Sequence, residues 1–267
     1  EIPLRLVGSE MCIRDSFFIL VSLLILFPMW KVIVDSFDAH SATSFRWWPN
    51  AFSVGGYNAI FSRSALYSPF VISVITTLVG TFMGLLLATL GGYVLIQWDM
   101  PGRNFFAYML LFTMIFDGGM VPKYLVMQNL HLLDTLWAVI LPMSINVYNL
   151  VLMRNFFEGI PESLFEAAQI DGCTSFQATV NIIIPLMRAS FVQCLFLTIT
   201  RCFMVYDVNL SLTKGEPFNS SVMAAMHVYN QAFTYKNYGL GQAEALVLFI
   251  VLSLIHISEP TRRRGIS

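Results

Sequence analysis

The stretch PFVISVITTLVGTFMGLLLATLGGYVLI, from Pro69 to Ile96, decides the fold of this chain. It contains no Asp, Glu, Lys or Arg, and it is longer than the ~20 apolar residues that a helix needs to cross a bilayer. Its small residues recur near helical spacing, which lets a neighbouring helix approach closely; they are Gly80, Gly84, Ala88, Gly91 and Gly92. The stretch therefore predicts a membrane-spanning helix inside a helical bundle.

The composition of the whole chain agrees with a membrane protein. Of its 267 residues, 57% are hydrophobic and 12% are charged, whereas a soluble domain carries about 25% charged residues. The mean hydropathy is +0.69. The net charge of -1 provides no basic field for nucleic acid, so no nucleic-acid partner is expected.

Further apolar blocks predict additional spans on both sides of this helix. They are Phe17 to Val34, Phe105 to Phe116 with a break at Asp117 to Pro122, Leu136 to Met153, Ala189 to Tyr206, and a last one that begins at Glu244 to Leu254. The segment from Asp207 to Gln242 is predicted to be a loop. The fold class is thus an all-α membrane protein with about six transmembrane helices.

The two ends differ in character from the middle. Leu6 to Ser16 and Ser253 to Ser267 look like translated adapter sequence, and such segments are excluded from fold reasoning. We therefore expect residues 1–16 and 253–267 to be non-native flanks and residues 17–252 to form the transmembrane domain. With the polar stretch after residue 153 placed in the cytoplasm, Lys and Arg fall on both sides of the membrane, so charge does not determine the orientation.

That polar stretch, Arg154 to Arg188, reads RNFFEGIPESLFEAAQIDGCTSFQATVNIIIPLMR. Pro161 suits the first turn of a short amphipathic helix. Gly172 is expected to end this helix because glycine readily adopts the left-handed conformation. Thr174 or Ser175 can cap a second helix that runs to Pro185. The pattern predicts a helix–turn–helix elbow between two spans, at residues 155–187.

The elbow resembles the EAA loop of ABC importer permeases, whose pattern is EAA-x3-G-x9-I-x-L-P. Glu166, Ala167, Ala168, Gly172, Ile182 and Pro185 match it, and Asp171 and Phe176 are also typical of the family. Ile184 departs from the family's usual Leu but keeps the apolar character. Other stretches, such as GGMVPKYL at Gly118 to Leu125, resemble the carbohydrate-uptake branch, namely permeases for polysaccharide or aldouronate-type sugars.

The resemblance implies a type I importer permease in a bacterial cytoplasmic membrane, with the elbow as a cytoplasmic coupling helix. The residues that would contact the ATPase are Glu166, Ala167, Ala168, Asp171, Gly172, Phe176 and Pro185. The implied partners are a second permease subunit, an ATPase dimer, an extracellular solute-binding lipoprotein, membrane lipid and a sugar-like solute. The chain has no G-x-x-x-x-G-K-[ST] motif, so ATP hydrolysis is expected in a separate subunit and the permease itself is not expected to be an enzyme.

Polar residues within the spans are candidates for the solute pathway. They are Asn146, Arg201, Tyr206, Asp207 and Asn209. Two alternatives remain open at this point. Arg201 can extend to the membrane interface, and a buried Asn often only bonds a neighbouring helix.

No cofactor or metal site is expected. The four Cys and four His are scattered along the chain, and neither CxxC nor HExxH occurs. The main competing hypothesis is an ion-coupled secondary transporter, which normally shows two related repeats of spans. No convincing repeat is present, and an EAA-type elbow has no purpose in a self-contained carrier.

Overall fold

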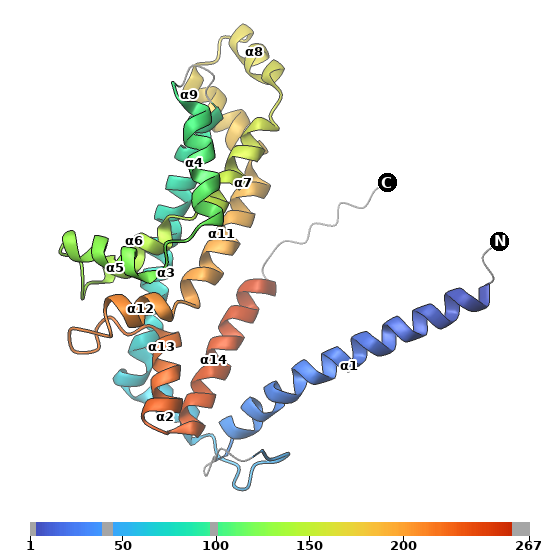
Figure 1. The fold of residues 1–267 in the computed structure, drawn as a ribbon, viewed down its shortest axis with the longest axis vertical. Helices are drawn as coiled ribbons and strands as arrows, with labels where there is room; N and C mark the ends of the chain where they lie inside the picture. The colour runs from blue at the N-terminus through green and yellow to red at the C-terminus, as the bar shows by residue number, and fades with distance from the viewer. Residues whose placement is uncertain (1–3, 39–44, 97–100, 258–267) are drawn as a thin grey trace. The chain divides into compact units, whose positions relative to one another are not determined.

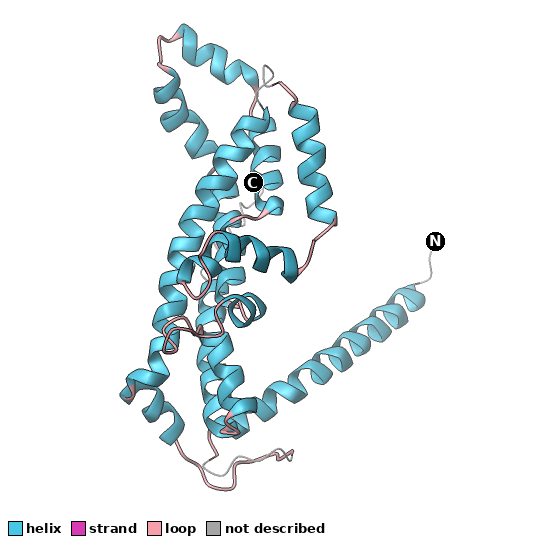
Figure 2. Ribbon diagram, turned by 60° about the vertical axis from the view of Figure 1, so that its left-hand side comes forward, coloured by secondary structure: helices cyan, strands magenta, loops and turns pink. Residues whose placement is uncertain are grey.

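The computed structural model describes the backbone of residues 4–38, 45–96 and 101–257 (Figure 1). Within these ranges every regular element is a helix, as Figure 2 shows, and an isolated β-bridge joins Asp38 to Phe52. The prediction of an all-α protein is confirmed.

Several helices are suited to a membrane by length and composition. Among the described residues, three qualify on their own: Arg14–Ser36 within α1 (Leu4–Ser36), α3 (Ser64–Ile96), and Leu136–Glu158, which comprises α6 and α7. Two bent helix pairs raise the number to as many as five, and Tyr238–Leu254 of α14 (Tyr238–Ile257) is a shorter apolar helix. This set is compatible with the predicted six spans.

The bends lie where residues interrupt the helical hydrogen bonds. The first pair, α4 (Arg103–Ile115) and α5 (Met120–Asn129), meets at 117° across the segment Phe116 to Gly119. This break was predicted at Asp117 to Pro122. The second pair is Thr179–Leu186 and α11 (Arg188–Phe203), bent by 60° just after Pro185. Proline has no N–H to donate to the preceding turn.

The chain divides into two compact units. Unit 1 comprises Glu1–Tyr67 and His227–Ile250, and unit 2 comprises Ser68–Met226 and Val251–Ser267. Unit 1 contains α1, α2 (Gly55–Ser62), the end of α13 (Ala224–Tyr229), a π-helical turn at Asn230–Thr234 and most of α14. Unit 2 contains α3 to α12, apart from the first residues of α3.

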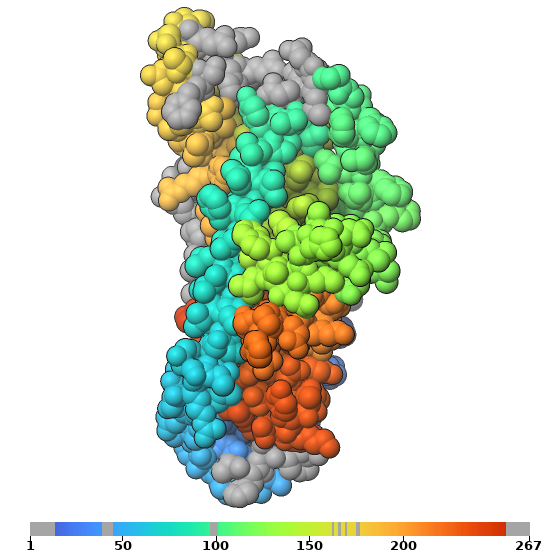
Figure 3. Space-filling model, turned by 90° about the vertical axis from the view of Figure 1, so that its left-hand side faces the viewer, coloured from blue at the N-terminus to red at the C-terminus, as the bar shows by residue number. Residues whose placement is uncertain are grey.

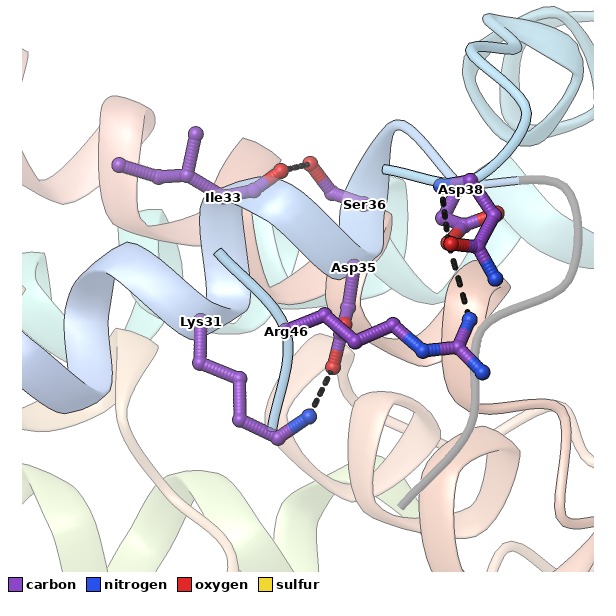
Figure 4. Close-up of polar contacts among 7 residues, drawn as sticks. Lys31, Ile33, Asp35, Ser36, Asp38 and Arg46 are labelled. Carbon is purple, nitrogen blue, oxygen red and sulfur yellow. Dashed lines mark hydrogen bonds and ion pairs between the residues drawn. The ribbon is translucent and has the colours of Figure 1, made fainter. Parts of the chain in front are cut away.

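In unit 1, one ion pair lies within the carboxyl end of α1 and another lies in the segment that follows it (Figure 4). Lys31 Nζ lies 2.6 Å from Asp35 Oδ2, one turn along the helix. Asp38 accepts hydrogen bonds from the backbone N–H of Asn50 and Ala51, and its carboxylate lies 3.5 Å from Arg46. A buried carboxylate with three donors is well satisfied.

Aromatic side chains gather beside this end of α1. The ring of Phe27 stacks on Phe45, Phe45 meets Trp47 edge to face, and Trp30 meets Trp48 in the same way. Trp47 and Trp48 are 62% and 73% exposed. Exposed Trp at the end of an apolar helix is typical of the membrane–water interface.

In unit 2, two buried clusters form the core. One joins α5, α6, α11 and α12 through residues such as Met127, Val139 and Leu212. Figure 3 shows α5 (yellow-green) and α12 (Asp207–Leu212, orange) against each other on one face. The other cluster joins α3, α7 (Val147–Glu158) and α11 through residues such as Ala88 and Met153.

The small residues of α3 do allow close helix packing, as predicted. A Cβ added at Gly84 would lie 3.0 Å from the carbonyl oxygen of Ser144 in α6 (Leu136–Ser144), and one at Gly92 would lie 3.0 Å from the backbone nitrogen of Arg154 in α7. The backbones of these helices are therefore nearly in contact.

Two segments differ from the sequence prediction. The predicted span from Leu136 to Met153 is interrupted at Ile145 and Asn146, where the backbone is extended. The predicted loop from Asp207 to Gln242 is wrong for most of its length, because it contains α12, α13, the π-helical turn and the first turn of α14. These helices are short and are held by tertiary contacts, so they leave little periodicity in the sequence.

The predicted domain boundaries at residues 17 and 252 remain a prediction. Helix α1 runs without a break from Leu4 to Ser36, and α14 runs to Ile257. Both helices thus extend into the stretches that resemble adapter sequence.

Candidate coupling elbow and solute pathway

The elbow predicted after α7 is present as two helical segments joined by a tight turn. The first segment is α8 (Glu162–Ile170), which begins directly after Pro161. The N–H of Asp171 donates to the carbonyl of Ala167, and the N–H of Cys173 donates to the carbonyl of Ala168 at 2.9 Å. Gly172 has a φ of +77°. These features are those of a Schellman motif, which ends a helix with glycine in the left-handed conformation.

The second segment starts with a capping box. The Thr174 hydroxyl accepts from the N–H of Gln177, and the Gln177 side chain accepts from the N–H of Thr174 at 2.9 Å. This reciprocal pair satisfies two helix-end donors and confirms Thr174 as the cap. Helical structure then runs through α9 (Ser175–Ala178), a π-helical turn at Thr179–Ile183 and α10 (Ile184–Leu186).

The elbow presents a mixed surface. Ala168 is 4% exposed, whereas Ala167, Asp171, Gly172 and Pro185 are exposed. The side chains of Glu166 and Phe176 lie outside the described residues. No atom lies within 4 Å of a Cβ placed on Gly172, so the turn itself is open to an approaching partner.

Ile170 is a feature of the elbow that the sequence analysis did not single out. It is the last residue of α8, and it is 86% exposed. A large apolar side chain on a turn that is otherwise polar is a typical contact residue of a protein interface. Its position two residues before the turn glycine was the available signal in the sequence.

The candidate pathway residues come from three parts of unit 2. Asn146 precedes α7, and its side chain accepts a hydrogen bond from the N–H of Tyr148 at 3.0 Å, so it caps that helix. Arg201 lies in the last turn of α11 and is exposed. Tyr206 and Asp207 lie at the start of α12, where the negative charge of Asp207 suits the helix amino terminus.

Asn209 is fully buried and all of its polar side-chain atoms are used within the fold. Its amide nitrogen donates to the hydroxyl of Thr213 at 2.8 Å and to the carbonyl of Ser221 at 2.7 Å. Its amide oxygen accepts from the N–H of Met223 at 3.0 Å. The side chain therefore ties α12 to the segment that leads into α13, and this geometry favours a structural role.

A second buried asparagine links two spans. The Asn149 amide in α7 donates to the hydroxyl of Thr198 in α11 at 2.8 Å, and both residues are 2% exposed. The hydroxyl of Thr198 in turn donates to the carbonyl of Cys194. Here the alternative that a buried Asn bonds a neighbouring helix describes the observed contact.

Unit 1 contains a buried polar network that the sequence did not reveal. Glu244 of α14 has no exposed surface, and its carboxylate lies 2.9 Å from His227 Nδ1. His227 Nε2 lies 3.4 Å from the amide nitrogen of Gln231, whose oxygen accepts from Asn237. Because the two partners are 17 residues apart in sequence, no local pattern connects them.

A cavity of about 540 Å³ lies in unit 1 between the segment after α1, the start of α2 and the start of α14. Its polar side chains are those of Ser36, Asp38, Ser53, Lys236, Asn237 and Tyr238. None of the predicted pathway residues lines it. Among the described residues, no group of three or more His, Cys, Asp or Glu gathers as metal ligands do.

Comparison with known families gives one extended match. The profile of the family described as "Binding-protein-dependent transport system inner membrane component" matches residues 102–258. This range includes the elbow and every candidate pathway residue.

Individual relatives are also similar. The polygalacturonan/rhamnogalacturonan transport system permease protein YtcP of Bacillus subtilis is 38% identical over 174 residues, which is 64% of this chain and 61% of the relative. The arabinooligosaccharides transport system permease protein AraQ of Bacillus subtilis is 30% identical over 183 residues, 66% of this chain and 65% of the relative. The chain thus spans less than two thirds of the length of these relatives.

A solved structure shares the fold. A chain of a bacterial ABC transporter involved in the import of the acidic polysaccharide alginate superposes with a TM-score of 0.79 at 22% identity, covering 96% of this chain and 95% of that chain.

Proposed function

Because this chain belongs to the family of binding-protein-dependent transport system inner membrane components, we propose that it is the permease subunit of an ATP-driven importer. In this proposal it forms the pathway for a sugar or oligosaccharide and is coupled to a separate ATPase through the elbow at residues 155–187. The protein is multi-pass in the bacterial cytoplasmic membrane.

The elbow is the observation that carries the proposal. It is a short helix closed by a Schellman turn at Gly172 and followed by a capped second helix, so it is rigid by construction. Its outer surface carries the exposed Ile170 and the exposed Ala167 and Asp171. A rigid element of this kind can transmit a rigid-body movement of a partner to the spans on either side.

The remaining contact residues of the elbow have distinct expected roles. Ala168 is buried, and its small side chain is proposed to allow close packing of the elbow. Glu166 and Asp171 are proposed to pair with basic groups of the ATPase, and Phe176 and Pro185 to hold the second helix in its orientation.

The proposed partners follow from this arrangement. They are a second permease subunit, an ATPase dimer in the cytoplasm and an extracellular solute-binding protein, with ATP hydrolysis located in the ATPase subunits. A chain of a second alginate transporter structure, solved with an oligosaccharide-bound periplasmic protein, superposes with a TM-score of 0.66.

A sugar-like solute is supported by the relatives, several of which are named for polysaccharide or oligosaccharide transport. Arg201, Tyr206, Asp207 and Asn146 are the proposed pathway residues, since donors, acceptors and an aromatic face are the groups that bind sugar hydroxyls. Asn209 is proposed to support this region through its hydrogen bonds.

The test is co-purification of the permease with a candidate ATPase from the same operon. Gly172→Val introduces a β-branched residue at a left-handed position, which costs about 1–2 kcal/mol, whereas Gly172→Asn tolerates that conformation and serves as the matched control. Glu166→Arg reverses a proposed contact charge. We expect the ATPase to be retained by the native chain and by Gly172→Asn and to be lost or reduced with Gly172→Val and Glu166→Arg.

The competing ion-coupled secondary transporter predicts a different result. In that case the purified chain alone moves solute in liposomes along an ion gradient, and changes in the elbow leave that transport intact. Such an outcome would refute the proposed importer.

A further inference from the structure

A cluster of three charged side chains joins α4 to α7 at the beginning of the elbow. Arg103 is the first residue of α4, and Glu158 is the last residue of α7. The Oε1 atom of Glu158 lies 3.2 Å from Arg103 Nη2, 3.0 Å from Arg154 Nε and 2.7 Å from Arg154 Nη2. One carboxylate oxygen thus accepts from two arginines on two helices.

The two helices differ in how firmly the rest of unit 2 holds them. No residue of α4 is buried, whereas Asn149, Met153 and Phe157 of α7 are buried. Helix α7 packs against the backbone of α3 near Gly92 and bonds α11 through Asn149. Helix α4 packs against α7, so the ion pair at its first residue joins a weakly held helix to a firmly held one.

The cluster lies close to α8 along the chain. Glu158 is separated from α8 by only three residues, Gly159 to Pro161, and Ile160 among them is 9% exposed. At its other end α4 leads into the 117° bend and α5. Whatever displaces the elbow therefore acts first on the end of α7 that carries Glu158.

We propose that Arg103, Glu158 and Arg154 form a brace that makes α4 move with α7, so that displacement of the elbow reaches the bent α4–α5 pair. Arg103 and Glu158 are positioning residues in this inference, which rests on the proposed coupling function of the elbow. Arg154 keeps Glu158 directed toward α4, since its two N–H groups bind the same oxygen.

The expected size of the effect is modest. The side chains of the three residues are 19%, 39% and 25% exposed for Arg103, Glu158 and Arg154, and water screens such pairs. Loss of one pair is expected to change the coupling about fivefold, which corresponds to about 1 kcal/mol at 1.4 kcal/mol per tenfold.

The experiment measures ATP hydrolysed per solute transported by the complete importer, with its ATPase and binding protein, in proteoliposomes. The variants are Arg103→Gln, Glu158→Gln and the exchange Arg103→Glu with Glu158→Arg. The exchange keeps two cations and one carboxylate in the cluster. Arg188→Gln is the matched control, because Arg188 is an exposed arginine at the start of α11 that forms no ion pair with a described residue.

We expect the ATP cost of transport to rise about fivefold in each single variant, to return toward the native value in the exchange, and to be unchanged in Arg188→Gln. Co-purification with the ATPase is expected to persist in all of them. If Glu158→Gln fails to assemble, Arg103→Gln alone decides, because it leaves the pair between Arg154 and Glu158 intact.

A ratio within twofold of native in Arg103→Gln, or an exchange variant no better than the single variants, overturns the brace. That failure is separate from failure of the coupling function, which is measured by loss of the ATPase in Gly172→Val.

Discussion

Substitution of Gly92 by Ala tests the close approach of α3 and α7. A Cβ at this position would lie 3.0 Å from the backbone nitrogen of Arg154 and 3.1 Å from the Cβ of Met153. Backbone atoms cannot rotate away as the end of a side chain can, so the helices must separate. Overpacking of this kind costs about 1–3 kcal/mol, and the better helix propensity of Ala offsets up to about 1 kcal/mol of it.

With an overpacking cost of about 2 kcal/mol, the middle of this range, the net destabilisation is about 1–2 kcal/mol. This corresponds to a decrease in Tm of about 2–8 °C at 2–4 °C per kcal/mol. The assay is thermal unfolding of the purified protein in detergent, followed by tryptophan fluorescence at one fixed scan rate, because irreversible unfolding makes Tm depend on that rate.

The matched control is Gly80→Ala in the same helix. There an added Cβ would lie 3.4 Å from the Cys202 Sγ atom and 4.0 Å from the Ser144 Oγ atom, which are ordinary contact distances to side-chain atoms. The Tm of this variant should equal or exceed that of the native chain. If Gly92→Ala is as stable as Gly80→Ala, the reasoning about close backbone packing is wrong.

Three further predictions concern buried polar groups. Asn209→Ala leaves the carbonyl of Ser221 and the N–H of Met223 without their side-chain partner, and we expect a loss of about 2–4 kcal/mol. The loss should be visible as a lower Tm and faster proteolysis within residues 213–223, whereas Asn149→Ala should leave proteolysis there unchanged. Glu244→Ala leaves the half-buried His227 without its carboxylate partner and should lower the Tm. Glu244→Gln retains a hydrogen-bonding group, so its Tm should lie between that of Glu244→Ala and that of the native chain. Asp38→Ala removes the acceptor of the backbone N–H groups of Asn50 and Ala51. Limited proteolysis should then cut residues 45–54 faster than in the native chain. Equal rates of cutting would contradict the assigned bonds.

The elbow illustrates what local sequence is able to predict. Gly172 ends α8 in the left-handed conformation, and Thr174 caps the next helix, as expected from the residues alone. Both features depend on contacts within five residues, so the sequence carries their signal.

The region after α11 illustrates the opposite case. Residues 207–242 were expected to be a loop, yet they form several short helices. Asn209 stabilises the first of them by bonds to Ser221 and Met223, which are more than ten residues away. Short helices of this kind are marginal by themselves and depend on tertiary packing, which the local pattern does not contain.

The sequence by itself determined that the chain is an all-helical membrane protein with an importer-type elbow, because apolar block length, glycine and capping residues act over short distances. The tertiary structure decided which polar side chains meet across the fold. The pairing of His227 with Glu244, the bond of Asn149 to Thr198 and the pairing of Arg103 with Glu158 join residues on different helices. Such pairings follow from how helices pack against one another, since the rotation and offset of each helix select the side chains that face its neighbours.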